Sequence, residues 1–188
     1  MKKMQVWTAV VILALAGSGR ALAEDGPQES RDAIALFLQA DPGLQEFLKS
    51  SVGYAVFPAV TKGAIGIGAA HGGGCVYERG ALVGTTSLTQ VTIGLALGGQ
   101  SFAEVIFFQT PEALDSFKKS ELTLSAQVSA VASSSGASDN AKYQLGVAVF
   151  TLARSGLMFE ASVGGQKFKF EPVAVVPAAG QTVRPMAK

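Results

Sequence analysis

GYAVFPAVTKGAIGIGAAHGGGCVYERGALVGTTSLTQVTIGLALGG, the stretch from Gly53 to Gly99, sets apolar and β-branched residues between closely spaced glycines. A helix over this stretch is disfavoured, because each interior glycine costs roughly 1 kcal/mol relative to alanine. We therefore expect a series of short strands whose glycines mark turns, bulges and close backbone contacts.

The first half of this stretch predicts three short strands. They are expected at Tyr54–Phe57, which Pro58 closes, at Ala64–Ala70, and at Cys75–Glu78 after a turn at Gly72–Gly74. A proline cannot donate to a sheet ladder, and consecutive glycines are typical of turns.

The second half predicts a strand from Ala81 to Leu97. Large apolar residues alternate there with small or polar ones, which predicts one face toward the core. A turn at Gly98 and Gly99 and a strand buried on both faces at Ser101–Phe108 are expected next. The apolar set is Val91, Ile93, Leu95 and Leu97, and the other set is Gln90, Thr92, Gly94 and Ala96.

Two short amphipathic helices are expected before the strands. Ser30 caps the first, which runs to about Ala40, and Asp41 caps the second with Pro42 in its first position. We expect both apolar stripes to pack on the sheet, the usual role of such a stripe, in preference to membrane insertion. A third helix begins at Thr110–Glu112, where a capping threonine, a proline and an acid stand in their preferred places.

The chain after this helix predicts further strands. Leu122–Ala132 alternates weakly, and Ser133–Asn140 has the composition of a solvated loop. A hairpin is expected from Tyr143–Ala153 and Leu157–Val163, joined by a tight turn at Arg154–Gly156.

The expected fold class is α+β. We expect a mostly antiparallel, glycine-rich curved β-sheet or barrel-like sandwich, with two short N-terminal helices and one mid-chain helix packed on it. Residues 30–172 are expected to form one domain, 24–29 a flexible N-terminus, and 173–188 a disordered tail.

Residues 1–23 have the three regions of a secretory signal peptide. Lys2 and Lys3 precede an uncharged apolar run, and a small-x-small triplet ends at Ala23, where we expect cleavage. The apolar run is shorter than the about 20 residues of a membrane span, so an uncleaved anchor is the weaker interpretation. We therefore expect a periplasmic or secreted protein.

Charge and cysteine content exclude several classes. The chain has 15 basic and 14 acidic residues, whereas nucleic-acid binders are markedly basic, so no nucleic-acid partner is expected. The single cysteine, Cys75, excludes an intramolecular disulfide. It also lies far from the leader, so we do not expect a lipoprotein.

The strongest catalytic candidate is the pair His71 and Cys75, four residues apart on a strand. Three glycines separate them and no third orienting group is identifiable, so burial of the cysteine is favoured over a thiol nucleophile. A metal site needs three or four ligands, most of which would have to be carboxylates here. No glycine cluster is followed by the residues that a nucleotide loop requires. We expect no enzyme activity, no cofactor and no metal.

Three carboxylates stand inside apolar strands: Glu78, Glu104 and Glu160. Since an ionised group there is costly unless it is paired or at the rim, salt bridges are favoured over an acid–base couple. For Glu104 and Glu160 the candidate partners are Arg79, Arg154 and Lys62.

Three blocks of the sequence, taken in order, resemble the SYLF domain. They are GYAVFPAVTKGAIGIGAAHGGGCVYERG, GTTSLTQVTIGLALGGQSFAEVIFFQTPEALDSFK and YQLGVAVFTLARSGLMFEASVGGQKFKFEP, and the resemblance covers roughly Leu36 to Pro172. It implies a lipid-binding module, because eukaryotic members of the family are described as lipid-binding and actin-associated.

The resemblance implies that the N-terminal amphipathic segment contacts lipid. Only two cations flank the two helices, which is a poor match to a polybasic membrane-binding surface. The resemblance therefore implies contact with hydrophobic or weakly anionic lipid. Phe37→Asp or Phe47→Asp is then expected to weaken vesicle binding without unfolding the sheet. The positions that match are Arg31, Ile34, Phe37, Leu38, Leu44, Phe47, Leu48 and Lys49.

The leading expectation is an exported, non-enzymatic, lipid-associating SYLF-type protein of the bacterial cell envelope, whose partner is membrane lipid, including anionic phospholipid. The alternative is a structural or scaffolding module that binds a protein partner of the envelope without lipid, through a strand edge or as an oligomer. An enzyme centred on His71 and Cys75 is disfavoured.

Overall fold

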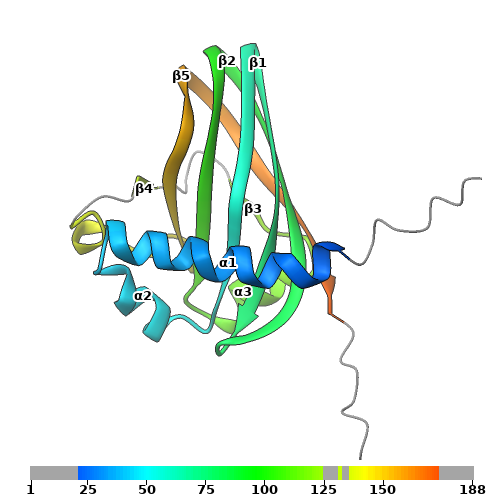
Figure 1. Cartoon of the computed structure of the whole chain (residues 1–188), viewed down its shortest axis with the longest axis vertical. Helices are drawn as coiled ribbons and strands as arrows, with labels where there is room; N and C mark the ends of the chain where they lie inside the picture. The colour runs from blue at the N-terminus through cyan, green and yellow to red at the C-terminus, as the bar shows by residue number, and fades with distance from the viewer. Residues whose placement is uncertain (1–20, 125–130, 133–135, 174–188) are drawn as a thin grey trace, which may run out of the picture.

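The computed structural model describes residues 21–124, 131–132 and 136–173. Long strands form the body of the molecule and helices cover its lower part (Figure 1). In chain order the elements are α1 (Ala21–Ala40), α2 (Leu44–Ser50), β1 (Gly53–Glu78), β2 (Ala81–Phe108), α3 (Pro111–Lys118), β3 (Thr123–Leu124), β4 (Val131–Ala132), the 3-10 helix η1 (Ser138–Asn140) and β5 (Val147–Pro172).

The strands form one five-stranded sheet in the order β1-β2-β5-β3, with β4 paired to β5. β2 is the central long strand, antiparallel to β1 on one side and to β5 on the other. Only the short β4, among the described strands, pairs in parallel. The expected α+β class with a mostly antiparallel curved sheet is confirmed.

The long strands are unbroken where we expected short strands separated by turns. Gly72–Gly74 lie within β1, and Gly98 and Gly99 lie within β2. The turn expected at Arg154–Gly156 is also wrong, because β5 continues through it and pairs with β2 from Val147 to Pro172. Glycine weakens a strand without ending it, and it also marks places where a second backbone comes close.

Each long strand folds over once, and together the three strands form an arch (Figure 1). β1 reverses near Gly66, whose φ of 76° suits glycine, and its second half lies against its first half. A Cβ on Gly74 would lie 2.2 Å from the Val56 carbonyl oxygen, so only glycine permits this approach. We call the residues around Gly66, with the β2 and β5 residues in register with them, the folded end.

A two-residue turn joins β1 to β2 at the opposite end of the arch. Arg79 (φ 50°) and Gly80 (φ 81°) both have positive φ, as a type I′ hairpin turn requires. The first pair of the ladder is Glu78 with Ala81.

Irregularities in both flanking strands lie at the same level of β2, next to Phe102. β1 shifts register between Phe57 and Val60, and in β5 Arg154 is the extra residue. The Arg154 Nη1 donates a hydrogen bond to the Pro58 carbonyl oxygen at 2.7 Å. This side chain therefore links β1 to β5 where both strands carry a bulge, a feature that bends a strand.

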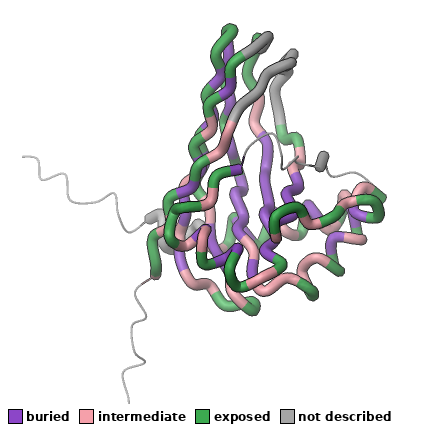
Figure 2. The backbone as a smooth tube through the Cα atoms, turned by 180° about the vertical axis from the view of Figure 1, so that it is seen from behind, coloured by how far each residue is buried: buried purple, intermediate pink, exposed green. Residues whose placement is uncertain are grey.

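Two apolar cores stabilise the body. The first lies between the two layers of the arch, where α3 contributes Leu114 and Phe117. The second lies between the sheet and the N-terminal helices, which contribute Phe37 and Leu44. Figure 2 shows the buried residues running through the body and exposed residues toward the upper end.

α1 begins at Ala21, earlier than the helix expected from Ser30. Residues 24–29, expected to be a flexible N-terminus, therefore lie in α1, and Ser30 is inside the helix and buried. The N-terminal part of this longer helix contacts β1, because the Tyr77 hydroxyl donates a hydrogen bond to the Pro27 carbonyl oxygen at 3.5 Å. Residues 1–20 of the expected leader and 174–188 of the expected tail lie outside the described residues.

The two predicted caps have different outcomes. Thr110 caps α3 as expected, because its Oγ1 accepts a hydrogen bond from the Ala113 N–H at 3.3 Å. Asp41 does not cap α2, which begins after Gly43. Instead its carboxylate accepts hydrogen bonds from the Ser138 N–H at 2.7 Å and the Ser138 hydroxyl at 2.8 Å, which fixes a segment distant in sequence.

Candidate functional site

The structure gives His71 and Cys75 no catalytic arrangement. Cys75 is 2% exposed and packs in the core beneath α1, whereas His71 is exposed on the outer face of β1. Burial raises the pKa of the Cys75 thiol, although the Ser30 hydroxyl beside it acts in the opposite direction. A raised pKa disfavours the thiolate, which is the nucleophilic form. Among the described residues, no three His, Cys, Asp or Glu side chains gather closely enough to hold a metal ion.

The predicted lipid-contact residues lie on α1 and α2, against the sheet. Phe37 and Leu44 are each 1% exposed. The expected packing of both stripes on the sheet is therefore confirmed, and Phe37→Asp would bury an unpaired carboxylate. Such a substitution cannot separate lipid contact from folding. Of the other six, Ile34, Leu38, Phe47 and Leu48 are partly buried on the same core, and Arg31 and Lys49 are exposed.

The structure gives partners for two of the three carboxylates inside the strands, and that of Glu104 differs from the expected ones. Glu78 forms an ion pair with Lys118, and Glu104 accepts a hydrogen bond from the Gln166 Nε2 at 2.9 Å. Arg154, one of the candidate partners, donates to a backbone carbonyl as described above. The side chain of Glu160 lies outside the described part of the structure.

Glu104 is the most strongly perturbed carboxyl group that the structure describes. Its side chain is fully buried between the layers of the arch, and its Oε1 has no hydrogen-bond partner. Burial raises its pKa to about 7, against a smaller opposing effect of the Gln166 hydrogen bond. The same Gln166 amide also donates to the Gln90 Oε1 at 3.3 Å. The three side chains form a polar cluster in which Glu104 is fully buried and Gln90 and Gln166 are partly buried.

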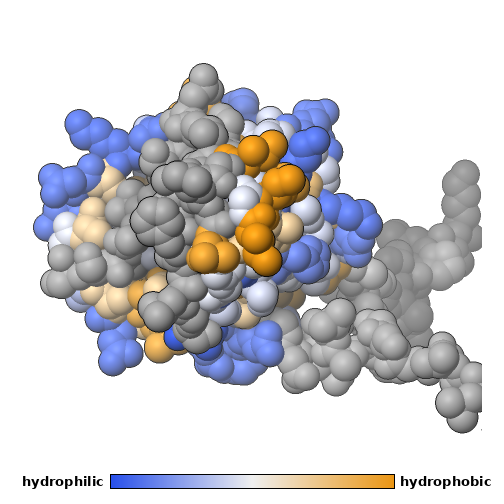
Figure 3. Space-filling model, turned by 90° about the horizontal axis from the view of Figure 1, so that it is seen from above, coloured by the Kyte–Doolittle hydropathy of each residue, from blue (hydrophilic) through white to orange (hydrophobic). Residues whose placement is uncertain are grey.

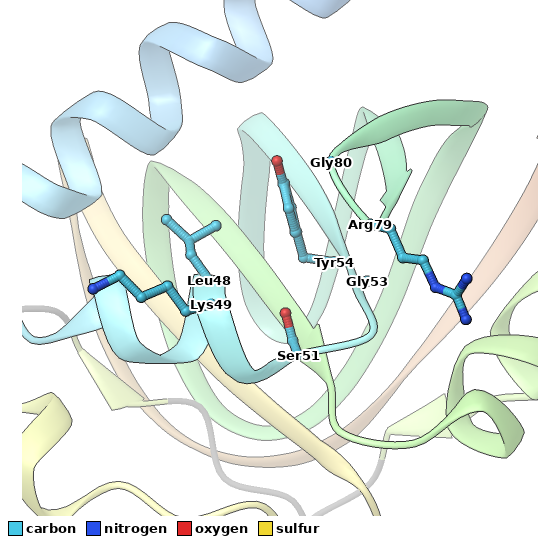
Figure 4. Close-up of a pocket in the computed structure, with 7 residues that line it drawn as sticks. All are labelled: Leu48, Lys49, Ser51, Gly53, Tyr54, Arg79 and Gly80. Atoms are coloured by element: carbon cyan, nitrogen blue, oxygen red, sulfur yellow. The ribbon is translucent and has the colours of Figure 1, made fainter.

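A hollow of about 330 Å³ lies at the base of the arch, between α2 and the β1–β2 turn (Figure 4). It is lined by two cations, Lys49 and Arg79, but Figure 4 shows their side chains pointing in opposite directions, away from the hollow. Lys49 also pairs with Glu46 at 3.3 Å. The hollow therefore lacks the convergent polar groups of a ligand site.

The most distinctive surface is at the folded end of the arch. Five of the seven large apolar residues that are exposed in the described part of the chain gather there, and we call them the apolar cap. Figure 3, which looks down on this end, shows their orange surface together. The cap consists of Ile65 (85% exposed), Ile67 (67%), Val91 (53%), Ile93 (68%) and Leu97 (65%).

The sequence predicted the alternation of β2 correctly but reversed its faces. Val91, Ile93 and Leu97 were expected to face the core, and the structure exposes them. Thr92 from the polar set is 3% exposed and faces inward. The alternation alone does not show which face is buried, because the buried face is set by the direction in which the strand folds over.

One signal in the sequence does mark this surface. Residues 63–70 and 91–99 contain no charged residue, although both segments turn out to lie at an exposed end. Exposed strands in water normally carry charged or polar side chains on the outer face. Once the reversal near Gly66 is known, the lack of charged residues in these two segments therefore indicates an exposed apolar surface.

The fold and this surface define the class: an α+β protein with a folded-over antiparallel sheet that exposes apolar side chains at one end. Within the described residues, no helix has both the length and the apolarity to cross a membrane.

Residues 89–173 match the family model Ysc84, described as "Las17-binding protein actin regulator". This segment belongs to the Ysc84 (SYLF) family, and the resemblance noted in the sequence is confirmed. The chain is also similar to a curated protein, "Beta cell expansion factor A" of Aeromonas veronii, with 27% identity over 139 residues. That alignment covers 72% of this chain and 52% of the relative, so the chain spans about half the length of the relative.

Proposed function

We propose that this protein is an exported, non-enzymatic protein of the bacterial cell envelope that associates with membrane lipid. The apolar cap carries the proposal, because it is a cluster of large apolar side chains that the fold leaves in water. Exposed apolar clusters of this kind mark protein–protein or membrane contacts. The resemblance to SYLF domains supports lipid as the partner.

The cap is large enough to matter energetically. Full burial of a Val, Leu or Ile side chain contributes about 1.5–3 kcal/mol, and all five cap side chains are more than half exposed. Their transfer from water to hydrocarbon is therefore worth on the order of 5–10 kcal/mol. That is enough for reversible binding to a membrane surface.

Two observations support a role other than catalysis. The only cysteine is buried with a raised thiol pKa, and the hollow at the base of the arch has diverging cations. The leader-like pattern of residues 1–23 supports export.

Vesicle flotation tests the proposal. The full sequence is expressed in a bacterium, the protein is recovered from the periplasmic fraction, and its N-terminus is determined by mass spectrometry. We expect a mature chain that begins at Glu24 and that rises through a density gradient with phosphatidylethanolamine–phosphatidylglycerol vesicles.

Different failures contradict different parts of the proposal. A chain that stays in the cytoplasm with residues 1–23 attached would overturn export. Protein that remains at the bottom of the gradient, like an inert soluble control, would overturn lipid association. A discrete cross-linked protein partner together with no bound lipid would favour the scaffolding alternative.

A further inference from the structure

We propose that the apolar cap is the part of the protein that enters a lipid bilayer, with Lys167 and His71 at the level of the lipid headgroups. This inference rests on the proposed function. It assigns the lipid contact to the folded end of the arch, in place of the helices α1 and α2.

The position of the cap suits insertion. It lies at the tip of the arch, and the helices α1, α2 and α3 lie around the lower part (Figure 1). Its side chains come from adjacent strands, because Ile65 is in register with Leu97 and Ile67 with Ile93. At this tip β2 is paired on both edges, with β1 on one side and β5 on the other.

The polarity of the upper arch is the reverse of a protein surface in water. Apolar side chains face outward there, while polar side chains lie between the layers. A hydrocarbon surrounding makes this arrangement favourable, because it takes up the outward apolar side chains and keeps the inward polar side chains away from the acyl chains. The inward side chains include Lys62, Gln90, Thr92, Glu104 and Gln166.

Residues in register across the three strands form rows, and the distance of these rows from the tip matches a shallow insertion. Val91 is in register with Ala69, three residues beyond Gly66, which at about 3.3 Å per residue places the cap within about 10 Å of the tip. Interfacial apolar faces enter a bilayer by about 5–10 Å. The next outward-facing row is His71, Thr89 and Lys167, all exposed. Lys167 therefore stands where an anionic headgroup would lie.

The size of the cap argues against a second copy of the chain as the occupant. The described cap offers on the order of a few hundred Å², and a stable protein interface buries about 800 Å² on each partner.

A single tryptophan reports depth at a chosen position. Trp7, in the expected leader, is the only tryptophan of the sequence, so the mature chain that begins at Glu24 provides an empty background. Ile67→Trp places the probe in the cap, and Leu145→Trp, at a residue 78% exposed outside it, is the matched control. Each protein is mixed with phosphatidylethanolamine–phosphatidylglycerol vesicles that contain acyl chains brominated at defined depths.

We expect strong quenching of the Ile67→Trp variant and little quenching of the Leu145→Trp variant. In protein recovered from the periplasm, Ile67→Asn should weaken vesicle partition by about ten-fold, whereas Leu145→Asn should change it little. Because both side chains are exposed, neither asparagine variant should lower the urea unfolding midpoint much. Leu145→Asn should keep or raise it, because the φ of 52° at this position suits asparagine better than leucine.

The outcomes separate the two proposals. Protein that floats with vesicles while the Ile67→Trp probe stays unquenched would overturn the assignment of the cap and leave lipid association standing. Protein that does not float would overturn both. A dimer in sedimentation that Ile67→Asn dissociates, with no partition into vesicles, would show that a second copy covers the cap and would also overturn the inference.

Discussion

Single residues in this protein carry contacts that their immediate sequence does not reveal. Asp41 stands in the position of a helix cap, yet its carboxylate holds Ser138, 97 residues further along the chain. Glu104 was expected to form a salt bridge and instead accepts a hydrogen bond from an amide inside the arch. Local patterns predict local partners, so long-range partners of this kind follow only from the fold.

Glu104 leads to a prediction about pH. Its pKa is raised from 4.5 to about 7, so the folded state keeps a proton that the unfolded state loses near pH 4.5. Stability therefore falls as pH rises from about 4.5 to about 7, by about 3 kcal/mol in total. Glu104→Gln should remove this loss, raising stability above pH 7 and flattening its pH dependence below. Urea unfolding at a series of pH values measures the effect.

The exposed carboxylate of Glu121 provides the control for this experiment. Glu121→Gln should leave the pH dependence close to that of the unmodified protein. If Glu104→Gln also leaves it unchanged, the buried carboxyl group does not titrate in the way that its burial implies.

At the scale of elements, the sequence predicted the type of each helix and strand better than the length of the strands. Strand character across 53–108, the start of α3 and the packing of the N-terminal stripes were all predicted from periodicity and caps. The number of strands was not predicted. Glycines usually mark turns, but several glycines of β1 instead lie where its two halves pack against each other. A contact between two halves of one strand leaves no periodic signal in the sequence.

Two neighbouring glycines test this explanation of β1. A Cβ on Gly74 would lie 2.2 Å from the Val56 carbonyl oxygen, whereas a Cβ on Gly73 would have nothing within 4 Å. Gly74→Ala should therefore destabilise the protein by about 2 kcal/mol or more, because the clash is with backbone. Gly73→Ala should be neutral or slightly stabilising. Equal unfolding midpoints for the two variants would contradict the close approach of the layers.

α1 gives a second prediction at this scale. Phe37 is 1% exposed and its neighbour Leu36 is 41% exposed. Phe37→Ala should lower the free energy of unfolding by about 3–5 kcal/mol, and Leu36→Ala by less than about 1 kcal/mol. Urea unfolding measures both. A small effect of Phe37→Ala would mean that α1 detaches easily from the sheet. α1 would then again be a candidate for lipid contact.

At the scale of the whole molecule, the two ends of the arch differ in chemistry. The lower end is covered by helices and holds both apolar cores. The upper end has apolar side chains outside and a polar cluster inside. The sequence predicted the fold class and the resemblance to the SYLF family. It did not predict that the upper end exposes apolar side chains, because the alternation of a strand does not show which of its faces is buried.

The β1–β2 turn has a consequence for how the chain acquires its structure. The ladder can start at Glu78 and Ala81, which are neighbours in the sequence, and each further pair encloses a longer loop until Gly53 meets Phe108. Zippering from this local nucleus closes each loop at a small additional entropy cost. β5 pairs with β2 across a long stretch of sequence, so we expect its docking to be the slow, non-local step of folding.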